Sequence, residues 1–165
     1  MTIALIGPMG AGKSSIGRRL AKSLGLPFTD TDVEIARRHG PIPELFAVGG
    51  EAGFRALERA VVAEALAGDG VVALGGGAVL DAETRRDLER CTVVLLTVSE
   101  EAVAPRIAGD RRPLLTEGLD SWRRIRDERA DLYASLADVT VDTSRRPITA
   151  LADELAERLR PVVAQ

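Results

Sequence analysis

A chain of 165 residues with 45% hydrophobic and 28% charged side chains has the size and composition of one globular domain. Its net charge of −3 and aromatic content of 3% disfavour a nucleic-acid-binding protein. No apolar stretch approaches the roughly 20 residues of a membrane span, and the first apolar run is too short for a signal peptide. The single cysteine, Cys91, suits a reducing compartment. We therefore expect a cytoplasmic monomer that binds neither nucleic acid nor membrane.

Apolar runs alternate with helical patterns along the chain, which is typical of a parallel sheet with helices on both faces. We predict strands at residues 2–6, 27–30, 71–74, 92–97 and 138–142. We predict helices at residues 13–24, 31–38, 51–67, 99–108, 119–136 and 147–160, and short helical turns at 42–48 and 81–89. The predicted fold is a single α/β domain over residues 1–165.

Residues 7–14 match the phosphate-binding P-loop motif, GxxxxGK[ST], between the first predicted strand and the first predicted helix. The backbone N–H groups of such a loop curl around phosphate oxygens, and Lys13 would reach the β- and γ-phosphates. Ser14 would offer its hydroxyl to Mg²⁺. The alternative is a glycine-rich turn that matches by chance. The motif and its setting predict binding of a nucleoside triphosphate.

Two aspartates, Asp30 and Asp32, follow the second predicted strand at the edge where open α/β sheets bind ligands. Strand alternation would place both carboxylates on one side, about 7 Å apart. One can reach Mg²⁺, directly or through water, while the other accepts or orients the proton of an acceptor hydroxyl. The alternative is that one of them only caps the following helix.

Two further features indicate a pocket for a small acidic acceptor. Gly75, Gly76 and Gly77 follow the third predicted strand, where a backbone without side chains lets a polar substrate approach. A tight turn is the alternative there. Arg55 precedes Glu58 by three residues on a predicted helix, either as a weak surface pair or with Glu58 holding Arg55 for a substrate carboxylate.

Residues 109–118 are charged and turn-prone and lie between two predicted helices. They form either a solvated loop or a mobile lid that closes over the triphosphate. In the second case Arg112 would be delivered to the transferring phosphoryl group.

Together these features resemble the shikimate kinase family, from Ile3 to about Leu159. The resemblance rests on residues 7–15, Asp30-Thr31-Asp32, Phe54-Arg55, Gly75-Gly76-Gly77, Arg112-Pro113-Leu114, Leu132-Tyr133 and residues 141–147. It implies a three-layer P-loop NTPase fold with a five-stranded parallel sheet, helices on both faces and a mobile lid. It also implies ATP-dependent phosphorylation of the 3-hydroxyl of shikimate, a step of chorismate and aromatic amino acid biosynthesis.

The resemblance also assigns site residues. It makes Lys13, Asp32 and Arg112 the catalytic residues. It assigns ATP to Gly10, Ala11, Gly12, Lys13, Ser14, Ser15, Arg106, Arg112 and Arg146, with Arg106 and Arg146 beside the adenine. It assigns shikimate to Asp32, Arg55, Gly75, Gly76 and Gly77. Mg²⁺ would be held by Ser14 and, through water, by Asp30.

One position departs from the family pattern. The family usually has an arginine directly after the Leu-Tyr pair, where it helps to bind the shikimate carboxylate, but Ala134 follows Tyr133 here. Loss of that contact would weaken shikimate binding about tenfold to a hundredfold. Arg126 and Arg129, earlier on the same predicted helix, are the candidates to replace it.

Three other functions compete with shikimate phosphorylation. One is a kinase for another small polyol acid such as gluconate, which the Ala134 departure favours. Another is a catalytically silent nucleotide-binding module, which the presence of Lys13, both aspartates and Arg112 disfavours. A nucleoside monophosphate kinase would need a nucleobase pocket, and the glycine-rich turn with Arg55 better suits a compact acid.

Overall fold

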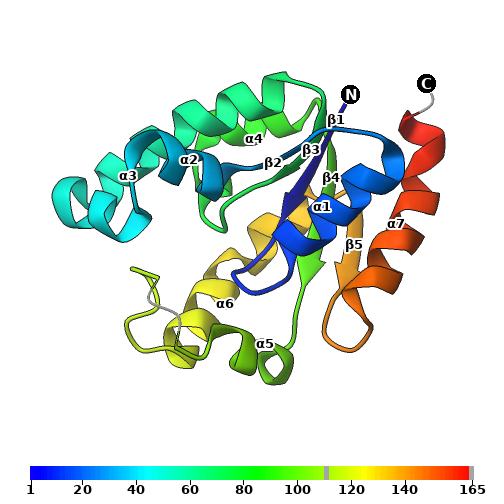
Figure 1. Cartoon of the computed structure of the whole chain (residues 1–165). Helices are drawn as coiled ribbons and strands as arrows, with labels where there is room; N and C mark the ends of the chain where they lie inside the picture. Colours follow the sequence, from blue (N-terminus) through cyan, green and yellow to red (C-terminus); the bar gives the residue numbers. More distant parts are fainter. Residues whose placement is uncertain (110–111, 164–165) are drawn as a thin grey trace.

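A five-stranded parallel sheet forms the centre of the fold in the computed structural model, which describes residues 1–109 and 112–163 (Figure 1). Its strands are β1 (Thr2–Ile6), β2 (Phe28–Asp30), β3 (Gly70–Ala73), β4 (Thr92–Thr97) and β5 (Val139–Asp142). The strand order is β2-β3-β1-β4-β5, and β1 pairs in parallel with both β3 and β4. The strand that leads into the P-loop is therefore the central one. The predicted α/β class and the five-stranded parallel sheet are confirmed.

Seven α-helices lie along the described part of the chain, between the strands and after β5. They are α1 (Lys13–Leu24), α2 (Thr31–His39), α3 (Ile42–Ala67), α4 (Ala82–Leu88), α5 (Glu100–Ile107), α6 (Leu119–Leu136) and α7 (Ile148–Val163). A short 3₁₀ helix, η1 (Ala78–Leu80), was not predicted. The segments expected at 42–48 and 51–67 form the two halves of α3, which is interrupted at Gly50 with φ 65° and ψ −172°. Of the expected lid, 109–118, residues 110–111 lie outside the described part of the chain.

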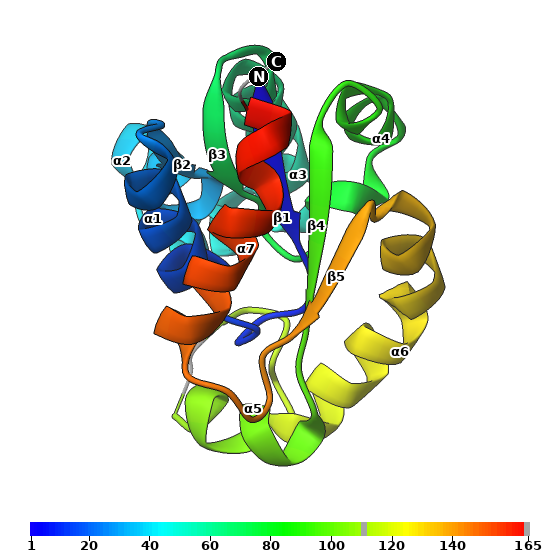
Figure 2. The ribbon, with the colours of Figure 1, turned by 90° about the vertical axis from the view of Figure 1, so that its right-hand side faces the viewer.

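Alternation along the buried strand β1 separates two hydrophobic cores. Ile3 and Leu5 pack into one core with side chains of α1 and α7. Ala4 and Ile6 pack into the other with side chains of α3, α4 and α6. Figure 2 shows α1 and α7 on one side of the sheet and α4 and α6 on the other. These are the three layers expected of the fold.

The parallel strands bring their carboxyl ends to one edge of the sheet. The P-loop follows β1, Asp32 follows β2, and the three glycines follow β3. Segments far apart in the sequence therefore meet at this edge. Among the described residues, no helix combines the length and the apolar character needed to cross a membrane.

Candidate active site

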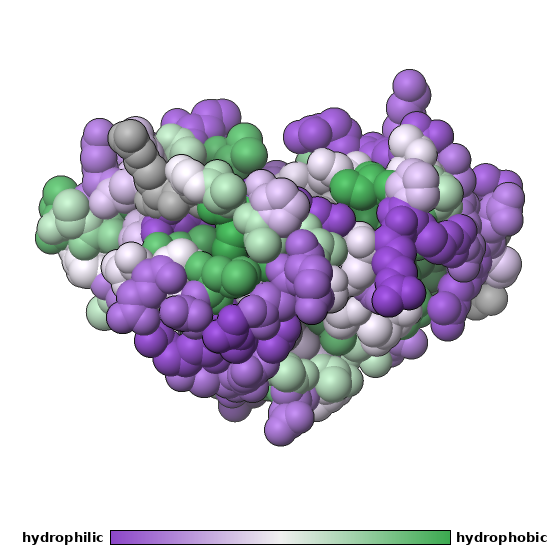
Figure 3. Space-filling model, turned by 90° about the horizontal axis from the view of Figure 1, so that it is seen from below, coloured by the Kyte–Doolittle hydropathy of each residue, from purple (hydrophilic) through white to green (hydrophobic). Residues whose placement is uncertain are grey.

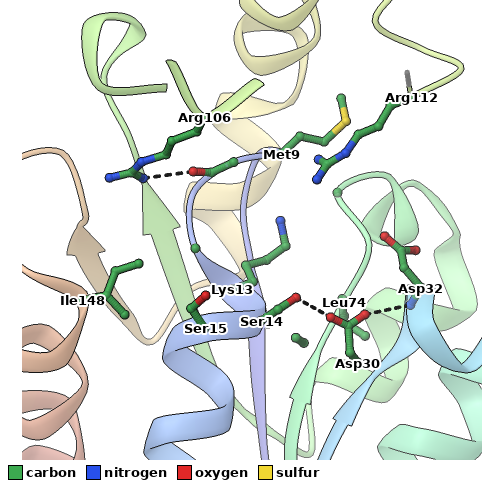
Figure 4. A pocket seen from close by; sticks show the side chains of 14 residues that line it. Met9, Lys13, Ser14, Ser15, Asp30, Asp32, Leu74, Arg106, Arg112 and Ile148 are labelled. Atoms are coloured by element: carbon green, nitrogen blue, oxygen red, sulfur yellow. Dashed lines mark hydrogen bonds between the residues drawn. The ribbon is translucent and has the colours of Figure 1, made fainter. Parts of the chain in front are cut away.

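Two adjoining pockets lie at the carboxyl ends of the strands. The first, here called the P-loop pocket, has a volume of about 380 Å³ (Figure 4). Every residue of the segment 9–15 except Ala11 lines it, together with Asp30, Arg106 and Ile148, among others. The second, here called the arginine pocket, has a volume of about 430 Å³ and is lined by Arg55, Glu58, Gly75, Gly77 and Arg129, among others. The residues common to both walls are Met9, Asp32, Gly76 and Arg112. Molecules bound in the two pockets would therefore meet at Asp32.

The P-loop adopts a backbone that depends on glycine. Gly7, Gly10 and Gly12 have φ values of 139°, 77° and 95°, which side chains disfavour. At Gly10 a Cβ would also come within 2.6 Å of Cγ2 of Val103. Gly12 caps α1 without a side-chain hydrogen bond, so the first N–H groups of the helix stay available for an anion.

Lys13 lies at the start of α1 with its side chain folded over the loop. Its Nζ donates hydrogen bonds to the carbonyl oxygens of Gly7 at 2.7 Å and Pro8 at 3.0 Å. Burial lowers the pKa of Lys13 to about 8, against the carboxylate of Asp32, which raises it. The nearby Arg112 guanidinium lowers it further. A bound triphosphate would supply the negative charge that favours the protonated form.

Asp30 combines a structural role with a site role. Its Oδ1 accepts hydrogen bonds from the backbone N–H groups of Asp32 at 3.0 Å and Val33 at 3.2 Å, which caps α2. Its Oδ2 accepts the hydroxyl of Ser14 (Figure 4). The hydroxyl of Ser14 and the carboxylate of Asp30 are oxygen donors of the kind that Mg²⁺ prefers, so they fit this ion. The described residues hold no cluster of three or more acidic, histidine or cysteine ligands, so phosphate and water oxygens would complete the coordination.

Asp32 lies in the site as expected, but a helix and not a strand positions it. Strand alternation was the wrong basis for placing it, because β2 ends at Asp30 and Asp32 belongs to the first turn of α2. Burial raises the pKa of its carboxyl group, and the neighbouring Asp30 raises it further. The positive charges of Lys13, Arg112 and Arg55 act in the opposite direction. Figure 4 shows Lys13, Arg112 and Asp32 extending towards the same space.

Arg55 is held in the arginine pocket by a buried carboxylate. Its Nη1 donates to Oε1 of Glu58 at 2.6 Å, and Glu58 is only 3% exposed. Burial raises the pKa of Glu58, and the adjacent Arg55 opposes this. The geometry matches the sequence interpretation in which Glu58 positions Arg55, and it is not that of a weak surface pair.

Two of the three glycines lie against charged side chains of the site, which the sequence did not reveal. A Cβ at Gly77 would lie 2.2 Å from Nη2 of Arg55, and a Cβ at Gly75 would lie 2.7 Å from Oδ1 of Asp32. Gly75 and Gly77 therefore leave room for the side chains of Asp32 and Arg55 in the positions that they occupy.

Helix α6 contributes Arg129 to the arginine pocket, and through Tyr133 it holds the glycine turn in the wall of that pocket. Arg129 is 8% exposed and lines the pocket, while Tyr133, one turn later, donates its hydroxyl to the carbonyl oxygen of Gly76 at 2.5 Å. Arg129 was one of two candidates named from the sequence. Tyr133 was not predicted as a site residue, although its spacing of four from Arg129 places both on one helix face.

The arginine pocket also has an apolar wall. It is formed by Ile42, Pro43, Phe46, Phe54, Pro113 and Leu114. Figure 3 shows apolar side chains gathered on the side of the molecule that carries α2 and α3, among hydrophilic ones. The pocket therefore offers charged groups on one side and hydrocarbon on the other.

Three residues named from the sequence lie elsewhere. Ala134 is exposed and lies outside the walls of both pockets. The side chain of an arginine at this position would therefore leave the helix on its solvent-exposed face. Arg126 stacks on the ring of Trp122, with its Cζ 5.0 Å from the centroid of the ring. Arg146 pairs with Glu154 at 2.6 Å and does not line the P-loop pocket. Its predicted contact with adenine stays a prediction.

Comparison with known proteins identifies the family. A family model described as shikimate kinase matches residues 9–160. The shikimate kinase of Pseudomonas paraeruginosa is 48% identical over 166 residues, covering 97% of this chain and 96% of that protein. The solved structure of a shikimate kinase from Acinetobacter baumannii in complex with shikimate has a TM-score of 0.92 and 36% identity, covering 98% of this chain and 93% of that one.

A gluconokinase from Sinorhizobium meliloti is a more distant neighbour. Its TM-score is 0.62 at 20% identity, and the match covers 99% of this chain and 93% of that one. Identity this low shows a shared fold and nothing about the acceptor. Three full-length relatives at 45–48% identity are shikimate kinases. The chain therefore belongs to the shikimate kinase family and is a kinase.

Proposed function

We propose that this enzyme transfers the γ-phosphoryl group of ATP to the 3-hydroxyl of shikimate, giving shikimate 3-phosphate and ADP. The observation that carries the proposal is the position of Asp32 in the wall common to the P-loop pocket and the arginine pocket. One pocket suits a triphosphate, and the wall of the other includes Arg55 and Arg129, which suit an organic acid. Family membership and the shikimate complex of the A. baumannii relative support the same acceptor.

On the donor side, the chain binds and orients the triphosphate. The backbone N–H groups of the P-loop and the first turn of α1 bind phosphate oxygens, and Lys13 reaches the β- and γ-phosphates. Ser14 and Asp30 would hold Mg²⁺, which neutralises phosphate charge when bound. Arg112, in the wall of both pockets, stabilises charge on the transferring group.

Asp32 handles the acceptor proton. Its carboxylate lines both pockets, and burial raises its pKa from the ordinary value of an aspartate. A raised pKa makes a carboxylate a better base for a hydroxyl proton, provided that it stays ionised at the working pH. The cations around it, Lys13, Arg112 and Arg55, keep the ionised form accessible.

Arg55 and Arg129 bind the shikimate carboxylate. Both guanidinium groups line the arginine pocket, and Glu58 holds Arg55 in place. Arg129 then binds the carboxylate in place of the arginine that the family usually has at the position of Ala134. The apolar wall suits the carbocyclic ring of shikimate better than the open chain of gluconate, which presents a hydroxyl on nearly every carbon.

The assay that tests this proposal compares acceptors directly. ADP formation would be measured with ATP, Mg²⁺ and either shikimate or gluconate, with Lys13→Met as the inactive control. We expect a much higher kcat/KM for shikimate and phosphorylation at the 3-oxygen by ³¹P NMR. A higher kcat/KM for gluconate, or ADP formation independent of any acceptor, would contradict the proposal.

We further propose that the enzyme acts as a cytoplasmic monomer. Residues of a single chain line both pockets, so no second copy is needed to complete the site. The substrate ATP and the lone thiol of Cys91 suit the cytoplasm. Light scattering during size-exclusion chromatography measures the mass, and an active species of twice 17.6 kDa would contradict the monomer.

A further inference from the structure

Three consecutive carbonyl groups of the P-loop accept hydrogen bonds from side chains that lie outside the loop. The bonds join Trp122 Nε1 to Met9 O at 2.8 Å, Arg106 Nη1 to Gly10 O at 2.9 Å and Thr143 Oγ1 to Ala11 O at 2.7 Å. The donors come from α6, from α5 and from the segment after β5. Three separate parts of the fold therefore converge on one stretch of backbone.

The direction of these bonds determines where the N–H groups of the loop point. In a planar trans peptide the C=O and the following N–H point in opposite directions. Holding the carbonyl of Met9 towards Trp122 therefore turns the N–H of Gly10 the other way. Holding the carbonyl of Ala11 towards Thr143 does the same for the N–H of Gly12.

The two glycines explain why such restraint is needed. Gly10 and Gly12 have φ values of 77° and 95°, and glycine loses little by rotating away from either conformation. Both glycines line the P-loop pocket. Without external donors, their peptide planes would be the most easily reoriented part of the phosphate-binding surface.

Trp122 and Thr143 do not touch the pocket themselves. Both are fully buried, at 0% exposure, and neither lines the P-loop pocket. Arg106 differs, because it lines the pocket as well as binding Gly10. Trp122 can therefore affect a bound nucleotide through the P-loop backbone. Thr143 acts on the same backbone and also accepts a hydrogen bond from Nη1 of Arg106 at 3.3 Å, so its effect can include the position of Arg106.

We propose that Trp122 and Thr143 are positioning residues for phosphate binding, which act by holding the carbonyls of Met9 and Ala11 so that the N–H groups of Gly10 and Gly12 face the nucleotide. This inference rests on the proposed binding of ATP by the P-loop. Donors that are already aimed bind an anion without the cost of reordering the loop.

Helix α6 supplies a matched control. Tyr133 donates its hydroxyl to the carbonyl of Gly76, so Trp122 and Tyr133 each hold one loop carbonyl from the same helix. Trp122→Phe and Tyr133→Phe each remove one donor and keep an aromatic ring. Trp122→Phe removes a hydrogen bond to the P-loop, and Tyr133→Phe removes a hydrogen bond to the glycine turn of the arginine pocket.

The experiment measures ADP affinity by calorimetry and the KM values of ATP and shikimate for both variants. For Trp122→Phe we expect an ADP Kd about three- to tenfold higher, the size of one lost hydrogen bond, with the KM of shikimate unchanged. For Tyr133→Phe we expect the reverse pattern. A general loosening of the fold would not separate the two substrates in this way.

A second pair of variants keeps the test independent of how Trp122→Phe folds. Thr143→Val preserves the shape of the side chain and removes the hydroxyl, whereas Thr143→Ser keeps the hydroxyl. We expect Thr143→Val to weaken ADP binding by a similar factor and Thr143→Ser to bind ADP nearly as the wild type does.

Two results would overturn the inference. One is a wild-type ADP affinity in folded Thr143→Val. The other is a proportional rise in the KM values of both substrates in Trp122→Phe and Thr143→Val, since that pattern indicates general structural damage. Failure of the proposed function is a different result, because the wild type would then form no ADP on addition of shikimate, whatever the ADP titrations of the variants show.

Discussion

Lys13 and Asp32 are charged groups that the fold holds in a partly dehydrated site. Burial lowers the pKa of Lys13 to about 8 and raises that of Asp32, so both shifts oppose the charged form. Each group is therefore less stable as an ion in the folded chain than in water. Active sites commonly carry such a conflict between stability and function.

The lowered pKa of Lys13 predicts a basic limit to ATP capture. Above about pH 8 Lys13 loses its proton in the enzyme that has not yet bound ATP, so kcat/KM for ATP should fall there. Bound phosphate favours the ammonium form, so the basic limb of kcat should lie at higher pH. Both profiles can be measured with saturating shikimate. A kcat/KM for ATP that stays flat well above pH 8 would contradict the role of Lys13.

Replacement of Asp32 should separate activity from stability. We expect Asp32→Asn to lower kcat by about 10²–10⁴-fold, the usual worth of a general base. Its raised pKa means that ionised Asp32 costs stability, and this cost grows as pH rises through the folded-state pKa. Asp32→Asn should therefore raise the Tm of the nucleotide-free enzyme at neutral pH, and the difference should shrink in acid.

Asp30→Ala provides the control of opposite sign for this experiment. Asp30 caps α2, so its loss should cost about 0.5–2 kcal/mol and lower the Tm. Thermal melts of both variants at several pH values measure these opposite changes in Tm. A lower Tm for Asp32→Asn at neutral pH would show that its ionised carboxylate stabilises the fold.

Site residues that are neighbours along the chain could be predicted from the sequence, whereas contacts between distant residues could not. The residues of the P-loop are consecutive, so their chemistry could be predicted from the motif alone. Arg129 and Gly76 are brought together only by tertiary packing, and Ala134 could be placed at the surface only once the face of α6 was known. The crowding of Gly77 by Arg55 likewise has no local signal.

Helix α6 is the element that joins the parts of the site. It carries Trp122 against the P-loop, Arg129 in the arginine pocket and Tyr133 against the glycine turn. Its helical pattern could be predicted from the sequence, and the structure gives the same bounds, residues 119–136. The interruption of α3 at Gly50 was anticipated only as a gap between two segments, because propensity does not reveal a left-handed φ.

Two of the four arginines of α6, Arg126 and Arg129, should differ sharply in their effect on substrate binding. Arg129→Ala should raise the KM of shikimate about tenfold to a hundredfold, because it removes a charge-assisted contact. Arg126→Ala is the matched control, since Arg126 stacks on Trp122 and pairs with Asp127 at 2.8 Å. Steady-state kinetics at saturating ATP measure both. Equal effects of the two substitutions would argue against Arg129 as the carboxylate ligand.

The sheet places both pockets at the edge formed by the carboxyl ends of its strands. The core on each face is built on the same strands, and β1 contributes to both cores. We therefore expect the chain to unfold as one unit, in keeping with the predicted single domain.

Ligand binding should stabilise that unit as a whole. ADP at a hundred times its Kd adds about 2.7 kcal/mol, which raises the Tm of a chain of this size by about 5–10 °C. Calorimetry should show one transition that moves with ADP, and Lys13→Met should respond much less. Two transitions, only one of which responds to ADP, would contradict a single domain.

The buried indole on α6 also has a spectroscopic consequence. Trp122 is the single tryptophan of the chain, and its N–H is bonded to the backbone of the P-loop. All of the tryptophan fluorescence of this protein therefore originates from one position beneath the nucleotide site. Indole emission responds to its hydrogen bonding and to local polarity, so the intrinsic emission can follow nucleotide binding without an attached label.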